Sequence, residues 1–200
     1  MKRTLLILTL ALCALCLQAR TPRLSYGLEW GYTGSFLRHC DYSFICSEGY
    51  RIVEHEDQWR YFSNGSVLAN VGLDLTRSVN LSVYSGLLGV WARRWMVPVE
   101  LRARYCPAGL HADGLVCHAG AALNFPTKTL KETCFRVHAG AGYRLAVYRD
   151  ISVDLLLSIQ YTTDHDLIND PDTGSWVPHS SIEFNNASYL ALNISAAINF

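Results

Sequence analysis

The chain has 200 residues, half of them apolar, and its 17 basic and 17 acidic side chains leave no formal net charge. Without a basic excess, the composition gives no electrostatic case for a nucleic-acid partner. The length suits one folded domain behind a targeting segment.

The N-terminus has the features of a bacterial signal peptide. Two basic residues precede a nearly unbroken apolar run over residues 4–17, and a small residue, Ala19, follows. The run is shorter than the roughly 20 apolar residues that a membrane-spanning helix needs. We therefore predict cleavage between Ala19 and Arg20, with residues 1–19 as signal peptide and residues 20–200 as the mature domain.

From residue 24 onward, apolar side chains recur at every second position. Leu24, Tyr26, Leu28 and Trp30 alternate with small or polar residues, which is typical of a strand with two unlike faces. The same pattern recurs along the chain, blurred only near residue 85. The predicted strands cover residues 24–33, 67–76, 79–89, 97–105, 115–125, 135–147, 151–161 and 190–200.

The connections between these segments alternate in length. Two long stretches, 38–66 and 163–186, fall at one end of the strands together with shorter ones near 93–96 and 126–133, and tight or compact turns fall at the other. Long outer loops and short inner turns are typical of outer-membrane barrels. The prediction is therefore an all-β fold: a closed, eight-stranded, antiparallel, up-and-down transmembrane β-barrel.

A soluble lipocalin-type barrel would show the same alternation with its faces reversed. Side-chain size favours the membrane protein, because the polar face is rich in glycine and serine, which fit a narrow interior. Aromatic residues near the long-loop ends predict an interfacial belt. These residues are Tyr32, Trp91, Phe125, Phe135 and Tyr161.

Two sequence features resemble known outer-membrane proteins. The last six residues, Ser-Ala-Ala-Ile-Asn-Phe, resemble the C-terminal signal that barrel-assembly machinery reads, with Phe200 as its aromatic end. Residues 96–105 resemble the proline-bearing fourth strand of the small "outer membrane protein beta-barrel" domain of Bacteroidota, and residues 138–143 are similar to its glycine-rich strand. The resemblance implies residence in the outer membrane of a Gram-negative bacterium, with membrane lipid and the assembly machinery as partners.

Eight charged residues fall on the predicted inner face, four acidic and four basic. Charges enclosed in a barrel must be paired and hydrogen-bonded, so we interpret them as a structural network that plugs the lumen. A gate whose ion pairs exchange partners is the functional alternative. The residues are Glu29, Asp74, Glu100, Arg102, Arg104, Arg136, Arg144 and Asp154.

Other reactive side chains give weaker signals. His118 and His138 share the inner face with Glu100, but hydrogen bonding explains them more simply than a metal or acid–base site, and no Ser-His-acid spacing supports a hydrolase. The aspartates between residues 164 and 172 are interpreted as a solvated acidic loop rather than a cation site. We predict no catalytic residue, no cofactor and no metal.

The mature chain keeps five of its seven cysteines, an odd number. Cys40 and Cys46 are close in sequence within the first outer connection, and we predict a disulfide between them in an oxidising compartment. Cys106 and Cys117 flank one turn but fall on opposite strand faces, so a bond between them would need a bulge.

The function that these features favour is a structural or surface-interaction barrel in the cell outer membrane, not an enzyme. Recognition of an envelope or extracellular protein or a glycan is predicted to use loops 38–66 and 163–186, since loops on a rigid scaffold tend to carry function. The alternatives are a barrel-embedded enzyme that modifies envelope lipid, and a narrow gated pore or small-ligand binder.

Overall fold

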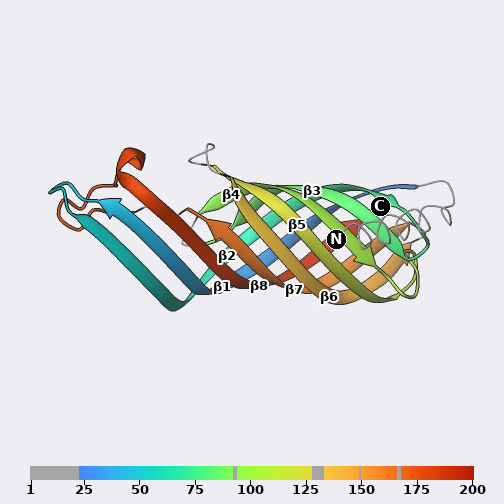
Figure 1. Ribbon diagram of the computed structural model, residues 1–200. Helices are drawn as coiled ribbons and strands as arrows, with labels where there is room; N and C mark the ends of the chain where they lie inside the picture. The colour runs from blue at the N-terminus through green and yellow to red at the C-terminus, as the bar shows by residue number, and fades with distance from the viewer. Residues whose placement is uncertain (1–22, 92–93, 128–132, 149, 166–167) are drawn as a thin grey trace, which may run out of the picture.

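The computed structural model describes residues 23–91, 94–127, 133–148, 150–165 and 168–200, apart from the side chain of His179. Within these ranges the strands form one closed antiparallel barrel in chain order, with β8 pairing back onto β1 (Figure 1). A short 3-10 helix, η1 (His179–Ser181), precedes the last strand. The strands are β1 (Arg23–Ile45), β2 (Arg51–Asp74), β3 (Val79–Gly89), β4 (Trp95–Tyr105), β5 (Gly114–Pro126), β6 (Cys134–Tyr148), β7 (Ile151–Asp164) and β8 (Ile182–Asn199).

The predicted fold class is therefore confirmed: all-β, eight-stranded and up-and-down. The predicted signal peptide, residues 1–19, lies outside the described residues. Among the residues that are described, no helix is long and apolar enough to cross a membrane.

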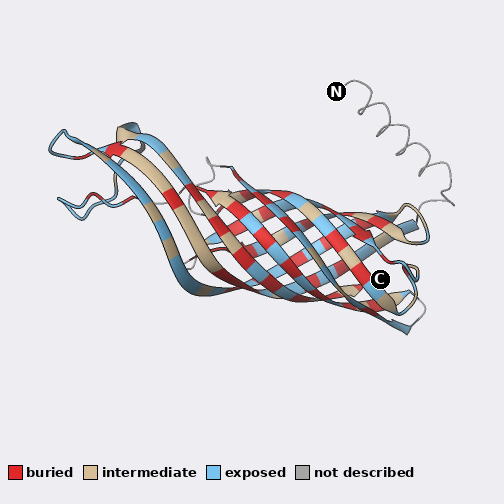
Figure 2. Cartoon of the chain, turned by 60° about the horizontal axis from the view of Figure 1, so that its bottom comes forward, coloured by how far each residue is buried: buried red, intermediate tan, exposed pale blue. Residues whose placement is uncertain are grey.

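The polar face of the strands points into the barrel and the apolar face points out. Buried and exposed residues alternate along the barrel strands (Figure 2). On β4, Leu101 is 53% exposed, whereas its neighbour Arg102 is only 3% exposed. On β1, Leu24 is 67% exposed and Glu29 only 4%. A soluble barrel places its apolar face inside, so the lipocalin alternative is wrong. The two shortest strands, β3 and β4, have 11 residues each, the length that a transmembrane strand needs.

Three strands continue far beyond the other five. β2 pairs with β3 only from Ser66, and β8 pairs with β7 only from Ala187, yet β1 pairs with both up to its end. We call the part of β1, β2 and β8 that lies beyond the register shift of β1 the extension; it comprises residues 37–45, 51–63 and 182–190, of which 187–190 also pair with β7. It projects from the barrel end opposite Phe200 (Figures 1 and 2).

The extension corrects one prediction. The stretch 38–66 is not a loop but most of a β-hairpin, whose turn comprises only residues 46–50. Polar and charged residues occupy both faces of this hairpin, so no apolar alternation marks its strands in the sequence. The last connection is also shorter than predicted, because β7 ends at Asp164 and β8 begins at Ile182.

A β-bulge at Phe36 marks where β1 leaves the barrel. The register shifts between Ser35 and Leu37 against both neighbouring strands. Relative to β8, Phe36 is an extra residue, and such a residue reverses which side chains of its strand face inward beyond it. As a result Ser35 is buried below the bulge and Cys40 above it, although their positions differ by an odd number.

Candidate functional site

The lumen is filled by two layers of ion pairs. In the layer nearer Phe200, Arg144 donates from Nε and Nη2 to the two carboxylate oxygens of Asp154, at 2.6 Å each. Arg104 donates to the same carboxylate at 3.4 Å, and Asn199 donates to it at 3.0 Å. The Asp154 side chain is fully buried, so this carboxylate is enclosed by donors from three other strands.

In the second layer, Glu100 is the central acceptor. Arg102 donates from Nε to Glu100 at 2.5 Å and from Nη1 to Glu29, across the barrel, at 2.6 Å. Arg136 donates to the other oxygen of Glu100, and His138 Nε2 lies 2.9 Å from Glu100 Oε1. All five side chains are at most 5% exposed.

The second ion-pair layer is surrounded by Tyr84, Gly120 and His118. The Arg102 guanidinium carbon lies 3.9 Å from the centre of the Tyr84 ring, a cation–π contact. A Cβ atom added at Gly120 would lie 2.4 Å from His138 Nε2, so only glycine allows His138 to reach Glu100 here. The second predicted histidine, His118, stacks obliquely on His138 with 5.5 Å between ring centres.

Little free volume remains around this layer. The cavity between Arg102, Arg136, His118 and His138 has about 10 Å³ accessible to the centre of a water molecule. That is about the space that one water molecule needs. Among the described residues, the side chains of this layer therefore leave room for about one water molecule between them.

An apolar cap closes the mouth at the base of the extension. The Trp91 ring packs on Phe62, with 4.3 Å between ring centres, and on Tyr189, with 5.3 Å. Ser35 Oγ and Asn64 Nδ2 hold the segment in place by donating to the carbonyl of Val90, at 2.7 and 3.0 Å. We define the cap as Cys40, Leu88, Val90, Trp91, Met96, Cys134, Ala187 and Tyr189.

The cap corrects another prediction. Trp91 is only 8% exposed, so it is not part of an interfacial belt, whereas Tyr32, Phe135 and Tyr161 are 44–50% exposed on the outer face. The residue pattern could not predict this position, because a tryptophan that follows a strand has the same pattern whether the chain turns outward or folds over the mouth.

Seven of the eight predicted lumen charges meet in the two layers. The eighth, Asp74, lies at the mouth near Phe200, where its side chain is 14% exposed and accepts a hydrogen bond from Asn80 at 2.7 Å. Phe200 itself stacks on Tyr26, with 5.7 Å between ring centres, on the apolar outer face. Its proposed role as an assembly signal remains a prediction.

The predicted disulfide between Cys40 and Cys46 does not form. Cys40 belongs to the cap, while Cys46 packs with Phe44 and Ile168 at the far end of the extension. Six residues of extended strand span roughly 20 Å, whereas bonded cysteines have Cα atoms within about 7 Å. Among the described residues, none of the five mature cysteines forms a disulfide.

The turn of the long hairpin is tied to the β7–β8 connection. The backbone N–H of Ser47 donates to Asp170 at 3.1 Å, and the Tyr50 hydroxyl donates to Asp172 at 2.9 Å. Backbone N–H groups, chiefly that of Asp172, hold the pKa of Asp170 below its usual value. The acidic residues of this connection thus fasten the hairpin.

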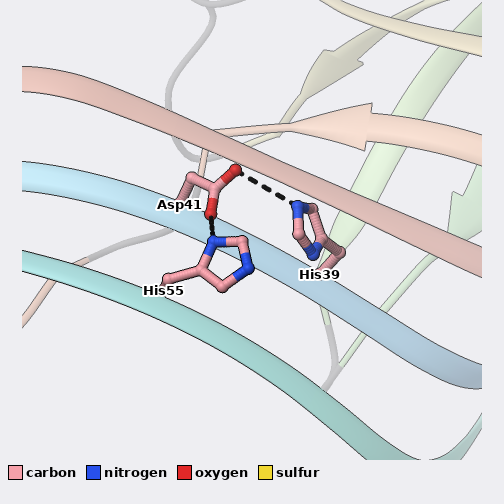
Figure 3. Close-up of side chains that lie close together, drawn as sticks. All are labelled: His39, Asp41 and His55. Atoms are coloured by element: carbon pink, nitrogen blue, oxygen red, sulfur yellow. Dashed lines mark hydrogen bonds and ion pairs between the residues drawn. The ribbon is translucent and has the colours of Figure 1, made fainter.

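A group that the sequence analysis did not predict as a site lies on β1 and β2 within the extension, and Figure 3 shows three of its side chains, His39, Asp41 and His55. We call His39, Asp41, His55 and Asp57 the His–Asp cluster. His39 Nε2 lies 3.1 Å from Asp41, which also bonds His55 Nδ1, and His39 Nδ1 lies 2.5 Å from Asp57. The Asp57 carboxylate raises the pKa of His39.

Comparison with solved structures identifies the fold. The crystal structure of the outer membrane protein OprG from Pseudomonas aeruginosa matches 88% of this chain over 95% of its own, at 8% identity and a TM-score of 0.52. The secretin InvG of the Salmonella SPI-1 type III secretion injectisome matches 98% of this chain over 68% of its own, at 10% identity. Its TM-score of 0.25 is too low to indicate a shared fold. No protein-family model and no curated protein sequence matches the chain. The fold is that of a small outer-membrane β-barrel, and the resemblance to the Bacteroidota family remains a prediction.

Proposed function

We propose that this protein resides in the outer membrane as a closed anchor, and that it presents the extension outside the cell to a protein or glycan partner. The observation that carries the proposal is a contrast within one molecule. Two ion-pair layers occupy the lumen and an apolar cap packs at its mouth, while three strands continue roughly 30 Å beyond the bulge.

The outer face of the barrel supports the membrane assignment. Its apolar side chains form a continuous surface around all eight strands, and residues such as Leu101, Leu155 and Ile194 are 53–63% exposed. Soluble monomers rarely expose apolar patches larger than a few hundred Å², whereas lipid covers such a surface without cost. Membrane lipid is thus the first partner, and the assembly machinery that reads Phe200 is the second.

The extension has the features of a recognition surface. Trp59 is 78% exposed, Val53 71% and Tyr61 62%, all on one strand of the hairpin. Aromatic residues of this kind are enriched at interfaces. In addition, among the described residues no strand pairs with the outer side of β2 before Ser66, and an unpaired edge accepts an added strand from a partner.

The proposal is tested by topology and conductance together. An epitope tag at Gly49, in the hairpin turn, should be accessible on intact cells, and a tag at Ala108, in an exposed turn at the other end, only after lysis. Purified protein in planar bilayers should show no steady conductance. Recovery in the soluble periplasm, or access to both tags only after lysis, would contradict the anchor; stable ion-selective channels would favour the gated pore instead.

Partner binding has its own test. A photo-cross-linking side chain at Trp59 should be compared with one at the lipid-facing Leu101 on intact cells. Protein or glycan adducts specific to position 59 are expected, and their absence at both positions would contradict a surface-interaction role.

A further inference from the structure

The His–Asp cluster is created by strand register. In the β1–β2 pair, His39 lies opposite Asp57 and Asp41 lies opposite His55. Directly opposed residues share a face, as do residues two apart on one strand. The four side chains therefore form a two-by-two grid in which each histidine has one aspartate across from it and another beside it.

The ligand atoms of this grid already converge. One ligand atom each from His39, Asp41 and His55 lies within 4.8 Å of the other two. In a tetrahedral zinc site, ligand atoms that each lie about 2.1 Å from the ion lie about 3.4 Å from one another. The three ligand atoms would therefore have to approach one another by little more than about 1 Å. Rotation about side-chain bonds accommodates that movement without moving the strands.

We propose that the His–Asp cluster binds a divalent transition-metal ion of the zinc class. The ligands are His39 Nε2, the Asp41 carboxylate and His55 Nδ1, and water completes the coordination. Imidazole nitrogen selects for zinc, nickel and copper, while sites for calcium and magnesium are built from oxygen. Two histidines and one carboxylate are a frequent zinc ligand set.

Asp57 acts as a positioning residue rather than a ligand. Its carboxylate lies 2.5 Å from His39 Nδ1, so it accepts that proton and leaves the Nε2 lone pair facing Asp41 and His55. A carboxylate behind a metal-bound histidine fixes the tautomer and ring orientation in this way. With neutral histidines the two aspartates carry two negative charges, which a divalent cation balances.

The site is open and rigid at once. The side chains of His39 and His55 are 40% and 66% exposed, so an ion can enter from solvent. All four residues lie within hydrogen-bonded strands rather than in a turn. The inference goes beyond the proposed function and does not depend on which partner binds the extension.

The test uses the untagged mature protein refolded in detergent. In a competition titration against a chromophoric chelator, Zn²⁺ should bind with one site per chain. Bound Co²⁺ should give the visible absorption of an ion with a low coordination number. His55→Gln is expected to weaken Zn²⁺ binding by at least about 100-fold, and Asp57→Asn by about 10-fold or more. His111→Gln is the matched control, because His111 is an exposed histidine 4.0 Å from a single carboxylate, Asp74.

The outcomes are distinguishable. Each variant must first show the same heat-dependent gel mobility as the native barrel, so that a folding defect is not mistaken for a lost ligand. Zn²⁺ binding that persists in both His55→Gln and Asp41→Asn, or that is lost equally in His111→Gln, would overturn the site. Equal competition by Ca²⁺ would overturn its assignment to transition metals, and unchanged affinity in Asp57→Asn would overturn the positioning role.

Discussion

The ion-pair layer around Asp154 offers the sharpest test of how the barrel is held together. Asp154→Ala would leave the guanidinium groups of Arg144 and Arg104 in the lumen without the carboxylate that both contact. Removing one partner of a buried pair costs about 3–5 kcal/mol, because the remaining charge is neither solvated nor paired. We expect the free energy of unfolding to fall by that amount.

The same end of the barrel provides a matched control. Arg23 and Asp150 also form an ion pair, at 2.6 Å, but their side chains are 52% and 49% exposed. Exposed pairs contribute about 0–1 kcal/mol, so Asp150→Ala should change stability little, and that small effect should shrink further in salt. The Arg144→Met/Asp154→Leu double variant removes both charges of the bidentate pair and should recover part of the loss.

Urea unfolding in detergent micelles, followed by tryptophan fluorescence and by heat-dependent gel mobility, measures all three variants. Asp154→Ala is expected to unfold at clearly lower urea than Asp150→Ala. If the two variants differ by less than about 1 kcal/mol while both fold, the lumen charges do not stabilise the barrel. The structural interpretation of the network would then be wrong.

Three further predictions address other parts of the chain. Gly120→Ala places a methyl group against His138 Nε2, so it should destabilise the barrel by about 1–3 kcal/mol in the same urea assay. Gly65→Ala is the control, because an added Cβ atom would meet only the Gly31 carbonyl oxygen at 3.9 Å, and it should change stability by less than about 1 kcal/mol. Deleting Phe200 should lower the yield of heat-modifiable barrel in cells several-fold more than deleting Thr173, and equal yields would remove Phe200 as an assembly signal. The lowered pKa of Asp170 means that its bond to Ser47 persists above the usual aspartate pKa of about 3.9 and is lost only as the pH falls through the lowered value. Limited proteolysis of the β7–β8 connection should therefore stay constant from neutral pH to about 4 and rise below that, and Asp170→Asn should abolish the transition.

The sequence alone determined the barrel wall. Where one face of a strand meets lipid and the other meets a polar lumen, a period of two is imposed on every residue. Leu24 through Tyr32 on β1 and Leu190 through Ile198 on β8 carry that period plainly. The same period of two also predicted the lumen charges, because Arg102 and Arg104 fall between the apolar residues of one strand.

Only the tertiary structure determined the extension, the position of Trp91 in the cap and the His–Asp cluster. Both faces of the extension are largely polar, so residues 51–63 lack the alternation that marks a strand, and Trp91 acquires its place in the cap from the path of the chain rather than from local pattern. The His–Asp cluster depends on register: His39 and Asp57 are 18 positions apart in the chain, and only the hairpin pairing makes them neighbours. Periodicity reports the medium that each face of a strand meets, but not which residues lie across from one another.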